Sequence, residues 1–133
     1  MRITLESDYA LRIVTAIAES DGVVDAGTLS EKTLVTQRFT LKILHKLVLG
    51  GLILSYKGAK GGYELARPAG EITLREVIET VEGPYAFSRC LDPNHACKCE
   101  SSTCKRGSCR FQRVYDEISE TVRQKLETVT FER

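Results

Sequence analysis

The segment that decides the fold is LILSYKGAKGGYELA, residues 52–66. It holds two short runs, Leu52 to Tyr56 and Tyr63 to Ala66, whose composition is typical of β-strands. The turn between them contains three glycines and two lysines, Lys57 and Lys60. This pattern predicts a β-hairpin with a positively charged tip.

Apolar periodicity before the hairpin predicts three helices, over residues 6–20, 26–34 and 37–49. The second helix could begin at Asp25 or at a capping box of Thr28 and Glu31. The side chains expected to face inward from the third helix are Phe39, Ile43, Leu44 and Leu47. Three helices followed by a hairpin is the element order of a winged helix-turn-helix, in which the third helix enters the DNA major groove.

The charge distribution agrees with a DNA-binding role for this region. Residues 36–67 contain six basic residues and one acidic residue, a net charge of +5, so the rest of a chain whose total is +1 carries −4. These could be solvated charges on an ordinary helix and hairpin. Their concentration in one predicted helix-turn-helix and wing favours a docking face for DNA.

The candidate DNA-binding residues lie at the start of the third helix and on the hairpin tip. Arg and Lys side chains bond guanine edges, and Gln pairs with adenine. A glycine-rich turn lets its backbone approach phosphates. The candidates are Thr36, Gln37, Arg38, Phe39, Lys42, Lys57, Lys60 and Gly61.

The second half of the chain predicts two more helices around a segment without periodicity. Thr73 and Glu76 form a capping box before a short helix that ends at Gly83. Residues 110–127 carry a long apolar stripe that must pack on its own domain or on a partner's equivalent helix. We therefore expect a winged-helix domain at 1–83, a cysteine-rich loop at 84–109, and a dimerisation helix with its tail at 110–133.

Several classes of protein do not fit the sequence. The sequence contains no run of about 18 apolar residues, which is the length that a transmembrane helix needs. No apolar signal-peptide core follows Met1, so we expect a cytoplasmic protein. Neither a P-loop nor a Ser/His/Asp set is present, which argues against an enzyme.

All five cysteines fall within twenty residues: Cys90, Cys97, Cys99, Cys104 and Cys109. Thiolates are soft ligands that suit iron–sulfur clusters and zinc. Four of the thiolates could bind zinc, although the usual Cys-x-x-Cys knuckles are missing. Thiol–disulfide switching is a third alternative, and an inert polar loop is a fourth.

Several stretches of the chain resemble the IscR/NsrR/CymR-type family of bacterial winged helix-turn-helix repressors. The resemblance covers nearly the whole chain in order, and it rests on MRIT (1–4), DYALR (8–12), GAKGGYEL (58–65), ITLREVI (72–78) and VEGP (81–84). It implies a homodimer that binds an imperfect DNA palindrome. In many members an iron–sulfur cluster, of the 2Fe-2S or 4Fe-4S type, makes DNA binding responsive to redox state, iron or nitric oxide. Other members have no cluster and sense through partner proteins.

The resemblance also implies cluster ligands. Cys90 and Cys109 lie at the family's distances from neighbouring motifs. The middle ligand stays open among Cys97, Cys104 and Cys99, of which Cys99 has no counterpart in the family. Asp8 resembles an acidic ligand that some members supply across the dimer, although a carboxylate in a first helical turn also favours the helix dipole. His95, within the loop, is a further candidate or a solvated side chain.

The chain departs from the family pattern at two positions. Leu34 stands where a small residue or glycine is usual before the turn, and Thr40 replaces a leucine that usually follows an aromatic residue. The target DNA sequence therefore cannot be taken from relatives. A role without DNA, as a metal-trafficking module or a cluster-free regulatory subunit of a metabolic enzyme, is the alternative function.

Overall fold

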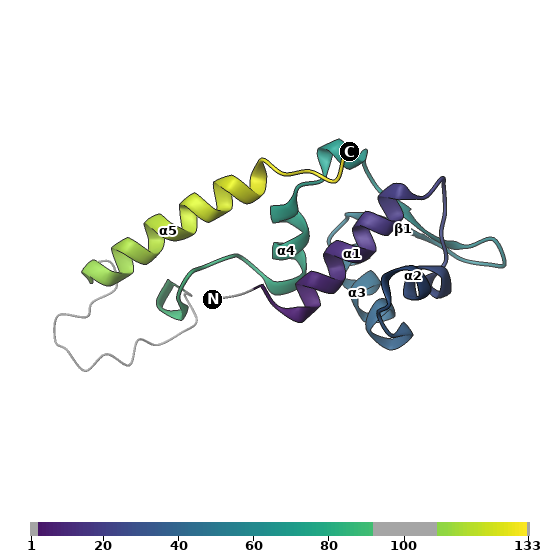
Figure 1. Cartoon of the computed structure of the whole chain (residues 1–133), viewed down its shortest axis with the longest axis horizontal. Coiled ribbons are helices and arrows are strands. Elements are labelled where there is room, and N and C mark those ends of the chain that lie inside the picture. Colours follow the sequence, from purple (N-terminus) through teal and green to yellow (C-terminus); the bar gives the residue numbers. More distant parts are fainter. Residues whose placement is uncertain (1–2, 92–108, 133) are drawn as a thin grey trace.

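The structure is a computed structural model that describes residues 3–91 and 109–132. Five α-helices, two strands and two short 3₁₀ helices follow one another in the described part of the chain. Their bounds are α1 (Leu5–Glu19), α2 (Ala26–Thr33), α3 (Gln37–Leu49), β1 (Ile53–Tyr56), β2 (Gly62–Leu65), η1 (Ala69–Glu71), α4 (Leu74–Glu82), η2 (Arg89–Leu91) and α5 (Arg110–Glu127). The first four α-helices and the hairpin form one body, and α5 leads away from it (Figure 1).

Side-chain caps fix where the helices begin. At the start of α3, the hydroxyl of Thr36 accepts a hydrogen bond from the backbone amide of Phe39. Thr73 and Glu76 form the predicted capping box at the start of α4. In α2 the cap is Asp25, whose carboxylate accepts the Thr28 amide at 3.0 Å. Because that amide already lies within the first turn of α2, Thr28 cannot itself cap the helix.

The core lies where α1, α3 and α4 meet beneath the hairpin. Its fully buried side chains come from these helices, from α2, from the start of β1 and from the residue pair before α4: Ile13, Val14, Leu29, Ile43, Leu44, Leu47, Ile53, Ile72 and Val77. The two strands pair antiparallel, with Tyr56 opposite Gly62. The loop after α1 pairs with β2 through Val24 and Tyr63, which holds the wing against the helices.

The prediction that Phe39 faces inward is wrong. Its side chain is 45% exposed and lies edge-on to Tyr9, with ring centroids 6.0 Å apart. Thr40 is fully buried instead. Thr40 precedes the core residues Ile43 and Leu44 by three and four positions, so helical geometry places it at the centre of the buried face and Phe39 at the edge.

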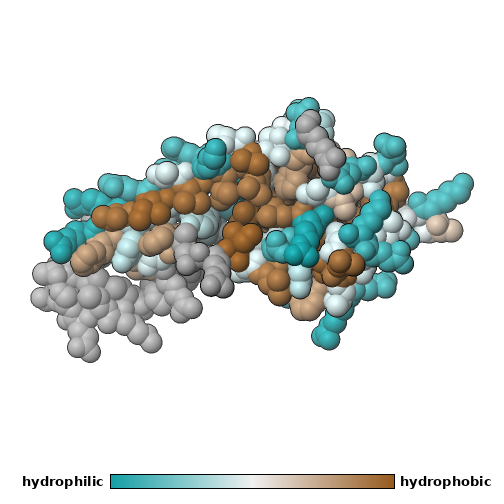
Figure 2. Space-filling model, in the orientation of Figure 1, coloured by the Kyte–Doolittle hydropathy of each residue, from teal (hydrophilic) through white to brown (hydrophobic). Residues whose placement is uncertain are grey.

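Helix α5 packs on α4 through one side and leaves the N-terminal part of its predicted apolar stripe exposed, while the rest of the stripe is half-buried. Ser119 is its only buried residue, whereas Phe111 is 55% and Val114 49% exposed. Figure 2 shows an apolar band along this helix. The segment after α5 returns to α4, where the Val129 carbonyl accepts the Leu74 amide at 2.8 Å. Within the described residues, the helices are too short or too polar to cross a membrane.

Candidate DNA interface and cysteine region

The face of α3 that the sequence assigns to DNA is open to solvent. The five candidates from this part of the chain, Thr36, Gln37, Arg38, Phe39 and Lys42, are all exposed. They occupy the helix's first two turns, opposite the buried side of α3. The N-terminal part of a recognition helix is the part that reads base edges in helix-turn-helix proteins.

The tip of the hairpin presents both of its lysines to solvent. Lys57 and Lys60 are exposed on either side of Gly58, whose φ of 100° is in the left-handed region that favours glycine. Gly61 is needed for a different reason, because a Cβ there would lie 2.3 Å from the Tyr56 carbonyl oxygen. The structure thus brings the wing candidates together in one tight turn.

Across the hairpin, the one acidic residue of the basic region is already bonded. The Tyr56 hydroxyl donates to the Glu64 carboxylate at 2.5 Å, and this bond raises the pKa of Tyr56 above its ordinary value. The carboxylate is therefore held along the strands, away from the lysines at the tip.

Two basic residues that the sequence counts toward the DNA face are paired within the domain. The Lys46 ammonium lies 2.7 Å from a Glu6 carboxylate oxygen and donates to the Val81 carbonyl at 3.4 Å. Arg67 lies 2.9 Å from Glu76. Lys42 lies 3.9 Å from Glu6 but remains 57% exposed.

Glu6 is therefore a residue of the basic face that sequence reasoning missed. It belongs to α1, and no pattern in the third helix could reveal it. Arg38, Lys57 and Lys60 have no ion-pair partner among the residues that the structure describes. These three cations remain available for phosphates or base edges.

Two of the five cysteines lie in the described residues, one at the beginning of α5 and one in η2, which packs against α5. Cys109 is the N-cap residue of α5, and Cys90 lies in η2, which packs against α5. The side-chain amide of Gln112, one turn into α5, donates to the Cys90 carbonyl at 2.9 Å. Both thiols are free and half-buried.

The remaining loop candidates lie outside the described residues. These are Cys97, Cys99, Cys104 and His95, all within 92–108. The chemistry of the two described thiols fits an iron–sulfur or zinc site, because both are unpaired and partly accessible at one end of a helix.

Asp8 is not brought to the two described cysteines within one chain. Its carboxylate lies 2.8 Å from the Arg12 guanidinium on the surface of α1. In the described segments 3–91 and 109–132, no three His, Cys, Asp or Glu side chains gather closely enough to hold a metal ion. A ligand role for Asp8 together with Cys90 and Cys109 would therefore need a second copy of the chain.

Three helices, an exposed basic third helix and a hairpin wing define a winged helix-turn-helix protein, a class that includes many transcription regulators. The chain belongs to the Rrf2 family, described as "Iron-dependent Transcriptional regulator", whose profile matches residues 3–133. The resemblance found in the sequence is thereby confirmed.

Individual relatives agree with this assignment. A Mycobacterium tuberculosis protein classed as an HTH-type transcriptional regulator is 36% identical over 91 residues, 67% of this chain and 56% of the relative. The regulator IscR of Xenorhabdus nematophila is 27% identical over 135 residues, 99% of this chain and 77% of the relative. This chain thus spans little more than half the length of the first relative. Both relatives carry names of HTH-type transcriptional regulators.

A solved structure supports the fold. CymR, the global cysteine regulator of B. subtilis, superimposes with a TM-score of 0.74 at 21% identity, over 98% of this chain and 93% of that one.

Proposed function

We propose that this chain is a DNA-binding transcription regulator that acts as a homodimer and is controlled by a cluster bound to its cysteines. The observation that carries the proposal is the placement of two features. An exposed basic helix and wing lie in the first half of the chain, and two free cysteines lie at the beginning of α5.

DNA binding is assigned to the exposed candidates on α3 and the wing. Arg38 and Lys42 are one turn apart and would read bases together with Gln37, while Lys57 and Lys60 would contact phosphates beside the groove. Thr36 caps the helix, and Gly61 allows the tight turn.

Dimerisation is assigned to residues 110–133, separately from the winged domain at 1–83 and the cysteine loop at 84–109. Support comes from the N-terminal part of the apolar stripe of α5, which the described residues leave uncovered: Phe111 and Val114 are each about half exposed. Two copies related by a two-fold axis would read two half-sites of an imperfect palindrome.

The cluster is assigned to Cys90 and Cys109, with Cys97 or Cys104 as the middle ligand and Asp8 of a second copy as the fourth. The family's description as iron-dependent supports iron, in a 2Fe-2S or 4Fe-4S cluster, over zinc. When bound, such a cluster would supply redox or nitric oxide sensitivity. The residues would hold it at the end of the helix that pairs the two copies.

A spectrum tests the cluster assignment. Protein purified without air should be brown, absorb visible light and contain iron and acid-labile sulfide. Colourless protein with stoichiometric zinc would contradict the iron assignment and favour the zinc alternative. Colourless metal-free protein that forms a disulfide on oxidation would favour a thiol switch.

Binding to a palindromic operator fragment tests the DNA assignment. Arg38→Ala and Lys60→Ala should weaken binding, and the Lys60 variant should also lower the salt dependence by about one unit of slope. Lys125→Ala, which removes a lysine from the exposed surface of α5, is the matched control. Equal binding by all three variants would favour the non-DNA role.

A further inference from the structure

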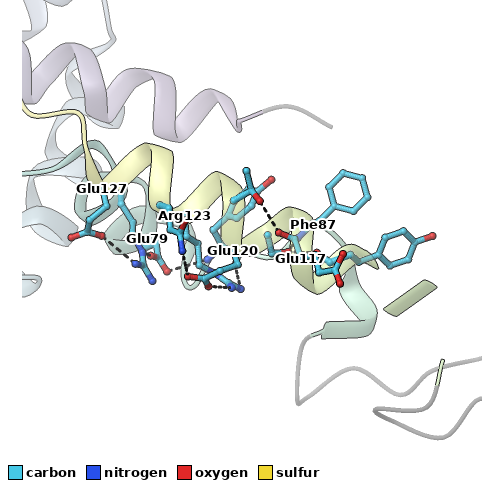
Figure 3. Close-up of polar contacts among 12 residues, drawn as sticks. Glu79, Phe87, Glu117, Glu120, Arg123 and Glu127 are labelled. Atoms are coloured by element: carbon cyan, nitrogen blue, oxygen red, sulfur yellow. Dashed lines mark hydrogen bonds and ion pairs between the residues drawn. The ribbon is translucent and has the colours of Figure 1, made fainter. Parts of the chain in front are cut away.

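The segment 84–91, which links α4 to the cysteine region, is bound along α5 at three points. The Arg123 guanidinium donates to the Tyr85 carbonyl at 2.9 and 2.6 Å. The Phe87 amide donates to the Ser119 hydroxyl at 2.8 Å, and the Gln112 amide group donates to the Cys90 carbonyl. Figure 3 shows Phe87 and Arg123 among these contacts along α5. We call segment 84–91 the strap.

The middle contact is the best buried of the three. Ser119 is fully buried, and its hydroxyl also donates to the Tyr115 carbonyl at 2.7 Å. The Phe87 ring lies 5.3 Å from the Tyr115 ring, centroid to centroid. A hydroxyl that donates to one carbonyl and accepts one amide has both functions satisfied, so its loss would leave a strap amide without its partner.

The α5 residues that bind the strap share one face of the helix. Gln112, Ser119 and Arg123 are seven and four residues apart, which is about two turns and one turn. The helix therefore fixes the order and spacing of the strap's contacts. Gln112 lies three residues after Cys109, so the last contact holds Cys90 beside the helix terminus that carries the other thiol.

The other end of the strap is tied to the winged domain. The Tyr85 amide donates to the Glu79 carboxylate of α4 at 3.1 Å, while its carbonyl is bound by Arg123 of α5. Glu82, just before the strap, accepts the Thr4 amide and the Ser7 hydroxyl of α1 at 2.8 and 2.6 Å. Movement of the strap would therefore act directly on α4 and, through Glu82 of α4, on α1.

We propose that the strap positions Cys90 for the cysteine site and connects that site to the winged domain, with Ser119 and Gln112 as the positioning residues. This rests on the proposed function for the identity of the bound group. The positioning itself is a property of the metal-free chain, because every contact involved is made by protein atoms alone.

The test uses the full chain, reduced and free of metal, in the variants Ser119→Ala and Gln112→Leu. Matched controls are Thr121→Val and Gln124→Leu, at exposed positions of the same helix. Two rates are measured: hydrogen exchange of the Phe87 amide and alkylation of Cys90 by iodoacetamide, read by peptide mass spectrometry. The loss of one hydrogen bond should raise each rate about fivefold, and the controls should remain close to the parent.

Unchanged rates in both strap variants would overturn the proposal, whether or not the protein binds iron. If the parent protein binds no iron, faster Cys90 alkylation in the strap variants would still support the strap and would reject the cluster. In protein that does bind iron, the strap variants should also release it faster than the controls. If Ser119→Ala does not fold by circular dichroism, Gln112→Leu, at a half-buried position, decides the outcome.

Discussion

Replacing Leu34 by glycine should stabilise the winged domain. Leu34 follows α2 with φ 58° and ψ 29°, a left-handed conformation that costs an L-residue about 1–2 kcal/mol. Its side chain is 88% exposed, so its removal sacrifices little buried surface. Glycine makes the unfolded chain more flexible, which offsets about 0.4–1 kcal/mol of the gain. The net change should be a stabilisation of roughly 0.5–1 kcal/mol, or about 2–6 °C in Tm.

Urea and thermal unfolding of reduced, metal-free protein measure this change in the free energy of unfolding. Leu34→Ala is the control, because it removes the same exposed side chain but keeps the Cβ that strains the backbone. It should stay within about 0.5 kcal/mol of the parent. Leu49→Gly, at a 74% exposed position in α3, should lose stability. Equal gains for Leu34→Ala and Leu34→Gly, or a loss for Leu34→Gly, would refute the backbone argument.

Three further predictions concern charge and the wing. Glu6→Gln releases Lys46 and should steepen the salt dependence of DNA binding by up to about 0.9 in slope, measured by fluorescence anisotropy; an unchanged slope contradicts this. Burial alone would raise the pKa of Glu82, but the hydrogen bonds from Ser7 and Thr4 of the N-terminal region outweigh burial and lower this pKa from its ordinary value of 4.5. Because the folded pKa is the lower one, the ionised carboxylate stabilises the fold above pH 4.5, and this stabilisation is lost as the pH falls through the folded pKa. Glu82→Gln should thus be less stable than the parent at pH 7, by up to about 1 kcal/mol in urea unfolding, and the difference should shrink as the pH falls below 4.5. Gly61→Ala places a Cβ against the Tyr56 carbonyl and should weaken operator binding while the helical circular dichroism is retained.

Most of the fold could be predicted because its signals are local. The helices predicted at 37–49 and 110–127 have those bounds in the structure, since apolar periodicity and caps are encoded within each segment. Leu34 is a single residue at which the local sequence also indicates the local backbone conformation. It stands where the family resemblance implies a small residue or glycine, and the structure gives it the backbone conformation that glycine favours.

The pairing of charges could not be predicted, because it joins residues that are far apart in sequence. Lys46 lies on the polar side of its helix, where a sequence reading assigns it to solvent or DNA. Its partner, Glu6, is forty residues earlier and meets it only when α1 packs against α3. Arg67 and Glu76 are nearer in sequence, yet a turn and η1 separate them, so no helical spacing links the two.

The cysteine region was predicted only in part for a related reason. The apolar periodicity of α5 predicts that its apolar residues are the buried ones, but Ser119 is buried and Phe111 is exposed. The strap presents backbone amides and carbonyls, which need polar partners, so it packs on a polar face beside the apolar one. Because both faces belong to one rigid helix, a second copy docked on the apolar stripe, as proposed, would contact the same α5 that fixes Cys90. Binding at Cys90 and Cys109 and pairing of the two copies would then be coupled through α5 itself.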